Sequence, residues 1–599
     1  MARPIEDYAL IGDLHTAALV ARDGSIDWLC LPRFDSSSTF AAILGNKEHG
    51  QWRVAPVGAE VCTDRRYDGD SFVLITRWVT EEGEVEVVDL MPQGGRRADV
   101  IRRVRGIRGT VRMNQELRIR FDYADALPWV RQLPDDDEDG MSNLVAVAGP
   151  DSVLIHGPQL EAVDHAHHGE FSVSEGETVD ITLTWYPSHR QPPPSVDVDH
   201  AIERTTTWWH RWASRFTDSG PYSDAVRRSL LVLRALTHAD TGGIVAAVTT
   251  SLPEDFGGER NWDYRYVWLR DASLTLQALM GHGYEREAAE WRDWLIRAIA
   301  GDPADVQIMY GLAGERRLPE TELRSLPGYN GARPVRIGNG AYEQFQADVF
   351  GEVMLALDQA RSIGVSEDNF SWSLQVALLD FLERSWQRPD NGIWEVRGPE
   401  RYFTHSRVMV WAAFDRGVAA VRERGLEGPV ERWEQLRDAV RAEIEEKGFD
   451  PVLGTYTQFY GGGGVDASLL ILPQVGYLAY DDPRMLGTVA EIERQLDRDG
   501  LLLRYRTESR VDGLEGDEHP FLACSFWLVQ QYAKSGRLDE GRALMDRLVS
   551  FQNDVGLLSE EYDTRGERHV GNTPQAFSHL TLVQAADAIA EAEAELLRA

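Results

Sequence analysis

A glutamate beside a tryptophan is the first group in this sequence that could carry out acid–base chemistry. Glu395 directly follows Trp394 in the segment DNGIWEVRGP, residues 390–399. A carboxyl group that packs against an indole loses solvation in its charged form, so its pKa rises. A raised pKa suits a general acid that works near neutral pH. Taken alone, a solvated surface position is the simpler interpretation, because the chain contains 97 Asp and Glu residues.

Two adjacent glutamates near the end of the chain form the second candidate. Glu560 and Glu561 lie in the segment LLSEEYDTRG, residues 557–566, just before the last predicted helix. Neighbouring side chains on an extended segment point to opposite faces, so at most one of the two is expected to face a site. Taken alone, this segment is also typical of a solvated acidic loop.

An aromatic-rich segment that leads into a predicted helix has the composition of a sugar-binding wall. In residues 259–279, Tyr264 and Trp268 precede Arg270 and Asp271. An arginine and a carboxylate can clamp sugar hydroxyls, and aromatic side chains form pocket walls. The competing interpretation is that Asp271 caps the helix N-terminus and the aromatic residues belong to the core.

Strands are the elements expected to support these groups in the first part of the chain. Short β-rich runs such as TVDITLTWYP (178–187) recur between turn pairs, and residues 111–121 alternate apolar and polar side chains. Many short strands without long intervening helices predict an antiparallel β-sandwich over residues 1–195.

Helices are expected to form the remainder. Three prolines in QPPPSVDVD (191–199) form a stiff connector, and residues 196–220 are predicted to be a linker with a helix at 201–216 that packs between the halves. Residues 221–599 have helical periodicity. Twelve helices are predicted there, near residues 224–239, 271–282, 285–300, 345–363, 370–386, 405–424, 429–447, 466–474, 482–496, 520–535, 538–551 and 574–596. Because no repeat of fixed length occurs, these helices predict an (α/α)6 toroid rather than a solenoid.

Length and charge limit the possible folds and partners. At 599 residues the chain exceeds one hydrophobic core, so at least two domains are expected. A formal net charge of −35 disfavours nucleic acid and anionic lipid as partners. No apolar run is long enough to predict a membrane span. The sparse cysteines, Cys30, Cys62 and Cys524, and an N-terminus without a signal-peptide pattern predict a cytoplasmic protein.

No cofactor and no metal is predicted. The chain contains neither a phosphate-binding loop nor a dinucleotide-binding fingerprint, and its histidines lack the spacing of a zinc-protease motif. His165, His167 and His168 cluster on a predicted loop and could contact a metal, but they lie far along the chain from the helical half.

Taken together, the three segments resemble glycoside hydrolase family 15, which contains glucoamylases, bacterial trehalases and isomaltose-splitting enzymes. The resemblance covers nearly the whole chain. Residues 5–44 look like the N-terminal module of the bacterial members, and the helical half looks like their (α/α)6 catalytic domain. The family's Tyr-x-x-x-Trp-x-Arg-Asp segment, which holds the terminal glucose, is matched with its spacing intact by Tyr264, Trp268, Arg270 and Asp271.

The resemblance also implies roles for the remaining residues. The family's general acid lies in a Trp-Glu pair, here Trp394 and Glu395. Its general base lies in a segment like Glu-Gln-Tyr-Asp, which makes Glu560 the base and puts Glu561 in place of the Gln. Arg504 and Tyr505 look like a pair that grips the sugar around the cleavage point. Gln346 matches a polar position after the loop aromatics more weakly.

The reaction implied by the family is hydrolysis with inversion. Two carboxyl groups about 6.5–9.5 Å apart leave room for one water between the base and the anomeric carbon. Protonated Glu395 would donate to the departing oxygen, and ionised Glu560 would deprotonate the attacking water. The expected product from an α-linkage is β-glucose.

The substrate remains open among several classes. The first expectation is an exo-acting, glucoamylase-like enzyme that removes glucose from the non-reducing ends of short α-glucans or isomalto-type oligosaccharides. The alternative within the family is an α,α-trehalase. More distant alternatives are an inverting disaccharide phosphorylase, which also joins a β-sandwich to an (α/α)6 barrel, and a glycan-binding protein that has lost catalysis.

Overall fold

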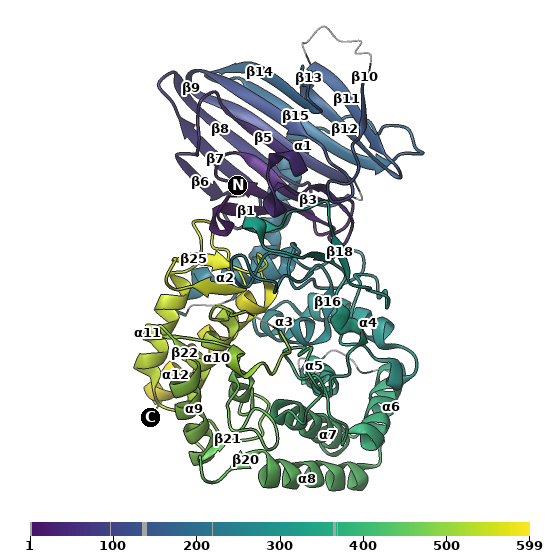
Figure 1. Ribbon diagram of the computed structural model, residues 1–599, viewed down its shortest axis with the longest axis vertical. Coiled ribbons are helices and arrows are strands. Elements are labelled where there is room, and N and C mark those ends of the chain that lie inside the picture. Colours follow the sequence, from purple (N-terminus) through teal and green to yellow (C-terminus); the bar gives the residue numbers. More distant parts are fainter. Residues whose placement is uncertain are drawn as a thin grey trace.

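A β-rich part and a helical part follow each other along the chain, and they lie at opposite ends of the molecule (Figure 1). The computed structural model describes residues 3–95, 97–133, 141–217, 220–362, 364, 367, 369–514 and 516–598. Among these residues, no helix combines the length and hydropathy of a membrane span.

One antiparallel, fifteen-stranded sheet forms the β-rich part. Its strands are β1 (Tyr8–Gly12), β2 (Ala17–Ala21), β3 (Ser25–Cys30), β4 (Ser38–Phe40), β5 (Gln51–Pro56), β6 (Asp64–Tyr67), β7 (Leu74–Val79), β8 (Gly83–Leu90), β9 (Ala98–Arg118), β10 (Trp129–Leu133), β11 (Met141–Ala148), β12 (Asp151–Pro158), β13 (Glu161–Val163), β14 (Ala166–Ser174) and β15 (Thr178–Pro187). This antiparallel, sheet-rich N-terminal part confirms the predicted fold class.

The long strand β9 joins the two layers of this sheet. Its residues 98–109 pair with β8 and β15, whereas residues 110–118 pair with β5 and β14. Along the second half, Val111, Met113 and Leu117 are buried while Arg112 is exposed, which is the alternation that the sequence predicted for residues 111–121. The strand ends three residues earlier than that prediction.

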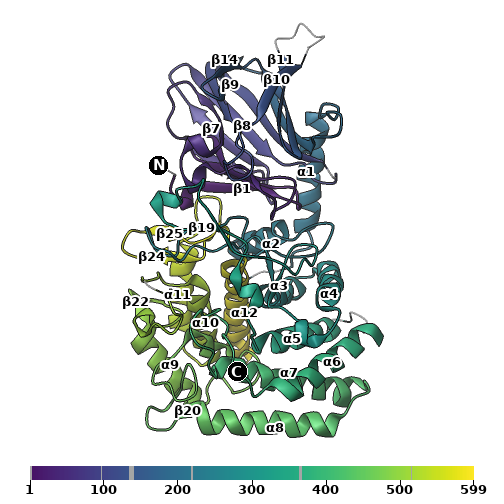
Figure 2. The same ribbon diagram turned by 45° about the vertical axis from the view of Figure 1, so that its right-hand side comes forward.

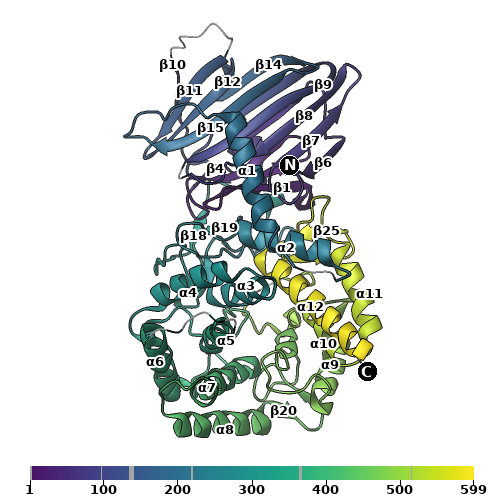
Figure 3. The same ribbon diagram turned by 180° about the vertical axis from the view of Figure 1, so that it is seen from behind.

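Helix α1 (Val198–Ala213) connects the two parts, as Figure 3 shows from behind. Val198 and Ala201 pack against apolar residues of the sheet. At the other end, the ring of Trp212 stacks on Tyr284, with ring centroids 4.0 Å apart. The helix begins three residues before the predicted start because the Asp197 side chain caps it by accepting a hydrogen bond from the His200 N–H.

In the described part of the helical half, eleven α-helices and one short 3₁₀ helix form two concentric layers. They are α2 (Ser223–Ala235), α3 (Leu269–Gly281), α4 (Glu285–Ile299), α5 (Asp348–Ser362), α6 (Asn369–Ser385), α7 (Thr404–Arg424), α8 (Val430–Lys447), η7 (Ala467–Ile471), α9 (Pro483–Leu496), α10 (Leu522–Lys534), α11 (Leu538–Val549) and α12 (Ala576–Arg598). The inner elements α3, α5, α7, η7, α10 and α12 contact one another in that order, and α12 closes the ring on α3 (Figure 2). This closed ring is the predicted (α/α)6 toroid.

The predicted helix at 466–474 is wrong in type. The segment is the 3₁₀ helix η7, in which the Asp466 side chain accepts a hydrogen bond from the Ser468 N–H. Pro473 follows two residues after the helix, and a proline cannot donate the backbone hydrogen bond that an α-helix needs. One inner position of the toroid is therefore filled by a single short turn.

A glycine allows two inner helices to approach closely. A Cβ on Gly351 of α5 would lie 2.4 Å from the backbone oxygen of Met409 on α7, which is far inside van der Waals contact. Close packing of this kind keeps the inner helices in a tight ring around the axis, where their N-terminal loops meet.

Candidate active site

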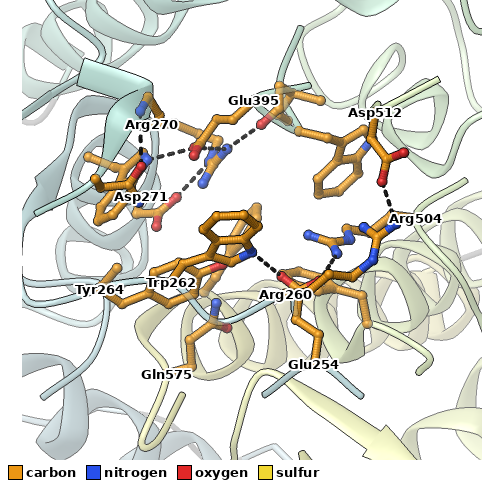
Figure 4. A pocket seen from close by; sticks show the side chains of 18 of the residues that line it. Glu254, Arg260, Trp262, Tyr264, Arg270, Asp271, Glu395, Arg504, Asp512 and Gln575 are labelled. Carbon is orange, nitrogen blue, oxygen red and sulfur yellow. Dashed lines mark hydrogen bonds and ion pairs between the residues drawn. The ribbon is translucent and has the colours of Figure 1, made fainter. Parts of the chain in front are cut away.

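Segments that precede the inner helices α3, α5, α7, α10 and α12 line one pocket. Figure 4 shows its side chains from close by. The pocket holds about 710 Å³ of empty space, the open mouth included. Its lining includes Glu254, Arg260, Trp262, Tyr264, Trp268, Arg270, Asp271, Trp394, Glu395, Arg397, Arg504, Tyr505, Asp512, Phe521, Gln575 and Phe577. Most of the residues singled out in the sequence thus come together at one site.

Glu395 projects into this pocket from the loop between α6 and α7. Its backbone has a positive φ of 58°, which is uncommon for a residue other than glycine and is typical of functional sites. The indole N–H of Trp268 donates to its Oε1 at 2.6 Å, and Arg270 Nη1 lies 3.8 Å from the same oxygen. Burial raises the pKa of Glu395 to about 7, although Arg270 opposes the rise.

The indole beside Glu395 is therefore Trp268, and this corrects part of the sequence argument. Trp394 lines the same pocket, but its indole N–H donates to Asp466 at 2.9 Å. The raised pKa follows from burial, as predicted, but the chain neighbour Trp394 does not make the hydrogen bond to Glu395.

Glu560 lies behind the wall formed by Tyr264. The Tyr264 hydroxyl donates to Glu560 Oε1 at 2.6 Å, and only 1% of the residue is exposed. Gly571 has a positive φ, and a Cβ there would lie 2.6 Å from Glu560 Oε2, so the glycine gives the carboxylate its space. Burial and then the charge of Glu254 raise the pKa of Glu560 to about 8, against the attraction of Arg504.

One short segment positions both carboxyl groups. Tyr264 and Trp268 are four residues apart, and their rings meet edge to face with centroids 5.4 Å apart. Each ring donates one hydrogen bond, Trp268 to Glu395 and Tyr264 to Glu560. The segment is itself fixed, because the Ala247 N–H donates to the Tyr264 carbonyl at 2.9 Å. Two carboxyl groups on adjacent aromatic rings are an arrangement suited to acid–base chemistry on a bound ligand.

Arg270 and Asp271 form the adjacent wall, at the start of α3. Arg270 Nε donates to Asp271 Oδ1 at 2.6 Å, and Arg270 Nη1 donates to the Ile393 carbonyl at 2.7 Å. Trp268 is the N-cap residue of the helix and no side chain caps it, so the capping interpretation of Asp271 is wrong. Both side chains line the pocket and are buried or nearly so.

Opposite this wall lies a buried charge cluster, in which Arg504 and Glu561 were singled out from the sequence but Glu254 and Glu518 were not. Arg504 Nη2 donates to Glu254 Oε2 at 2.7 Å and to Glu518 Oε2 at 2.6 Å, and it lies 3.6 Å from Glu561 Oε1. Glu561 also accepts a hydrogen bond from the His519 N–H. Neither of the two adjacent glutamates lines the pocket itself: Glu560 lies behind the lining residue Tyr264, and Glu561 lies behind the lining residue Arg504.

The three carboxylates of this cluster are close enough together to hold a metal ion. Glu254, Glu518 and Glu561 offer oxygen atoms within 4.8 Å of one another, and among the described residues they are the only such group. The guanidinium of Arg504, however, already lies among these oxygens and supplies the positive charge that they require. The histidine cluster at 165–168 does not form such a group in the described part of the chain.

A second set of charged side chains also lines the pocket. Arg260 and Asp512 form a buried ion pair of 2.6 Å, and the Tyr505 hydroxyl donates to Asp512 at 3.0 Å. The guanidinium of Arg397 lies over the ring of Trp262, 4.1 Å from its centroid. Trp262 was visible in the aromatic segment, but no spacing in the sequence connects it to Arg397 or Asp512.

Gln346 is the predicted substrate-binding residue that the structure leaves outside the pocket lining. It is buried near the start of α5, where its amide donates to Gln344 Oε1 at 3.1 Å. Gln344 in turn donates to the Glu395 backbone carbonyl at 3.1 Å. The start of α5 turns Gln346 toward this supporting contact instead of toward the pocket.

Comparisons with known proteins point in one direction. The model of the family described as "Glycosyl hydrolases family 15" matches residues 220–587, and a model described as "Trehalase-like, N-terminal" matches residues 1–154. A trehalase of Mycobacterium tuberculosis is 37% identical over 99% of this chain and 90% of its own length. A trehalase of Thermoplasma acidophilum is 34% identical over 96% of this chain and 98% of its own length.

The fold is also that of a solved enzyme structure. A bacterial glucoamylase complexed with acarbose matches 98% of this chain and 94% of its own chain, with a TM-score of 0.70 and 12% sequence identity. At that identity the likeness concerns the fold, and it covers both the sheet and the helical toroid.

Proposed function

The chain belongs to family 15 of the glycosyl hydrolases, and we propose that within this family it hydrolyses α,α-trehalose to two molecules of glucose. The observation that carries this proposal is the similarity to trehalases over nearly the full length of both chains, N-terminal part included. The sequence alone favours a glucoamylase-like activity first and a trehalase second. The relatives favour the second of these.

In the proposed mechanism, Glu395 is the general acid. Its carboxyl group faces the pocket beside Trp268, and burial keeps it protonated to higher pH than a solvated glutamate. The proton would pass to the glycosidic oxygen as the bond to the anomeric carbon breaks, so that the leaving glucose departs as a neutral alcohol.

Glu560 is the general base in this proposal. The Tyr264 hydroxyl and the Asn572 N–H donate to its two oxygens and favour the charged form. An ionised Glu560 would remove a proton from the water that attacks the opposite face of the anomeric carbon. Arg270 and Asp271 would hold the ring hydroxyls so that the attack is in line.

A substrate panel with detection of the product anomer tests this proposal. The purified protein would be incubated with trehalose, maltose, isomaltose and maltotriose, and early products would be followed by ¹H NMR. Hydrolysis of trehalose with inversion gives one β-glucose from the cleaved ring and one α-glucose from the leaving ring, in equal amounts before mutarotation. Retention would give α-glucose alone.

Three outcomes would count against the proposal. Faster hydrolysis of maltose or isomaltose than of trehalose would identify a glucoamylase-like enzyme instead. Conversion that requires phosphate and yields β-glucose 1-phosphate would identify a phosphorylase. Binding of trehalose without turnover would identify a glycan-binding protein.

A further inference from the structure

A second large cavity is lined by residues of both the β-rich part and the helical part, and by residues of the connecting helix α1. It holds about 1620 Å³ of empty space, the open mouth included. The turn after β1, the residues after β8, and helices α1, α2 and α4 all contribute to its wall. The catalytic pocket shares none of these wall residues.

A buried arginine without a partner lines this cavity. Arg234 of α2 is only 7% exposed, and its Nε and Nη1 atoms have no hydrogen-bond partner among the described residues. The face of Trp208, 5.6 Å from the guanidinium carbon, is its aromatic neighbour. An unpaired charge in such a position is costly for the folded protein, because burial removes its hydration. We therefore expect the buried Arg234 guanidinium to pair with a bound anion.

The acidic residues nearest to Arg234 are already paired with other arginines. Glu287 accepts hydrogen bonds from Arg215 and from the Trp212 indole, and Glu290 accepts one from Arg286. Glu287 and Glu290 attract Arg234 from a distance, but burial outweighs them and lowers the pKa of Arg234. Among the described residues, therefore, no carboxylate forms a hydrogen bond or an ion pair with the guanidinium of Arg234.

A different part of the cavity wall carries hydrogen-bond acceptors. Asp13 and His15, from the turn after β1, line the cavity together with Asp240. The two His15 ring nitrogens lie 3.9 Å from Asp13 and 3.7 Å from Asp240. Carboxylates and an imidazole in this arrangement accept hydrogen bonds from hydroxyl groups and repel a second anionic group.

We propose that this cavity is a binding site for a small polyol that carries one anionic group, such as a sugar phosphate. The anion pairs with Arg234, which binds phosphate and carboxylate groups through its planar fork. The hydroxyls face the acidic wall at Asp13 and Asp240, and the apolar side of the polyol packs on Trp208. A neutral sugar would leave Arg234 unpaired, and a bare anion would leave most of the cavity and its acidic wall without a partner.

Isothermal titration calorimetry on the full-length protein tests this site, with glucose 6-phosphate, inorganic phosphate and glucose as separate probes. Glucose 6-phosphate should bind at one site per chain and at least tenfold more tightly than inorganic phosphate. Arg234→Met should weaken that binding at least tenfold. Arg397→Met is the matched control, because it removes an arginine from the catalytic pocket and should leave the binding unchanged.

Several results would overturn the proposal. These are no binding of glucose 6-phosphate, equal binding by Arg234→Met, loss of binding in Arg397→Met but not in Arg234→Met, or inorganic phosphate binding as tightly as glucose 6-phosphate. Glucose bound with the same affinity and the same dependence on Arg234 would also overturn it, because the anionic group would then contribute nothing.

The stability of the variant gives an independent readout. If Arg234 is kept for a ligand, the ligand-free Arg234→Met protein should melt at the same temperature as the parent or higher, because a buried unpaired charge has been removed. Glucose 6-phosphate should raise the melting temperature of the parent and not that of Arg234→Met. A variant that melts several degrees lower, or fails to fold, would show that Arg234 has a structural role and would overturn the proposal.

Discussion

Each of the two proposed catalytic carboxyl groups accepts one hydrogen bond from an aromatic side chain. A glutamine at either position can therefore keep that contact. In Glu395→Gln the amide oxygen can still accept from Trp268, and in Glu560→Gln it can still accept from Tyr264. Glu395→Gln removes the ability to exchange a proton, and Glu560→Gln removes in addition the long hydrogen bond that Glu560 Oε2 accepts from the Asn572 N–H at 3.4 Å. This makes the two roles separable by experiment.

We expect Glu395→Gln and Glu560→Gln each to lower kcat on trehalose by about 10²–10⁴-fold, the contribution typical of a general acid or base. α-Glucosyl fluoride distinguishes the two, because fluoride departs with little need for a proton. Glu395→Gln should recover most of its activity on this substrate, whereas Glu560→Gln should not. Circular dichroism and melting temperature would verify that both variants fold, and near-parental activity on trehalose would remove that residue from the mechanism.

The pH dependence follows from the same two groups. Burial raises the pKa of Glu395 to about 7, and burial with the nearby Glu254 raises that of Glu560 to about 8. The mechanism needs Glu395 protonated and Glu560 ionised. Below about pH 7 the required state declines because Glu560 gains its proton, and above about pH 8 it declines because Glu395 loses its own. We therefore expect kcat/KM to follow a bell with its maximum between about pH 7 and 8; a maximum below about pH 6 would contradict this.

Glu254→Gln tests the origin of the acidic limb. Removing the charge of Glu254 lowers the pKa of Glu560, so kcat/KM near pH 6 should rise relative to its value near pH 9, where Glu395 alone limits the rate. Arg504 keeps its hydrogen bond to Glu518 in this variant. Glu434→Gln removes a charge from the exposed surface pair with Arg422 and should leave the profile unchanged.

The type and spacing of residues in the sequence identified most of the pocket residues. They could not predict the direction in which each side chain points. Tyr264, Trp268, Arg270 and Asp271 lie within one segment, so their joint presence at the pocket followed from a single motif. Gln346 lies two residues before α5, and only the turn of the chain there decides that it faces Gln344. Glu254, Arg260 and Asp512 meet through tertiary packing, which no local pattern records.

At the scale of elements, apolar periodicity predicted the position of nearly every helix but not its type at 466–474. The residues ASLLIL (467–472), which include η7, fit a helical face and a 3₁₀ turn equally well. Asp466 and Pro473 decide the outcome, because one starts a tight turn and the other ends it. The sequence contained both residues, yet their effect depends on how α7 and α10 close around this short element.

The close approach of α5 and α7 leads to a stability prediction. Gly351→Ala would place a Cβ 2.4 Å from the Met409 backbone oxygen, so one of the two inner helices must shift. We expect the free energy of unfolding to fall by about 1–3 kcal/mol, as is typical of overpacked cores. Gly463→Ala is the control, because its Cβ would meet open space. Urea unfolding followed by tryptophan fluorescence would compare the two, and an unchanged midpoint for Gly351→Ala would mean that the helices are less tightly packed.

At the scale of the whole molecule, the sheet supports the segment that forms one wall of the candidate active-site pocket. The Trp28 indole of β3 donates to the Val248 carbonyl at 2.7 Å, and Arg265 Nη1 donates to the Ser36 carbonyl at 2.8 Å. Val248 and Arg265 lie on either side of the pocket residues Glu254, Trp262 and Tyr264 along the chain. The sequence predicted two kinds of structure in succession, but it could not predict these contacts, because they join residues more than 200 positions apart.

The same contacts predict that the two parts unfold together. Apolar side chains of the sheet, such as Trp28 and Trp52, and of the toroid, such as Leu230 and Trp291, belong to one continuous buried cluster. Separate domains with polar interfaces unfold independently, whereas a shared core couples them. We expect scanning calorimetry of the full chain to give one endotherm, with activity lost over the same temperature range. Two resolved transitions, the first of which leaves activity intact, would mean that the sheet does not hold the 248–265 segment in place.

Trp28→Phe tests one of these contacts directly, because it keeps an aromatic ring but loses the hydrogen bond to Val248. The variant should lower both the melting temperature and kcat, because the segment that aligns Tyr264 with Glu560 would lose one of its anchors.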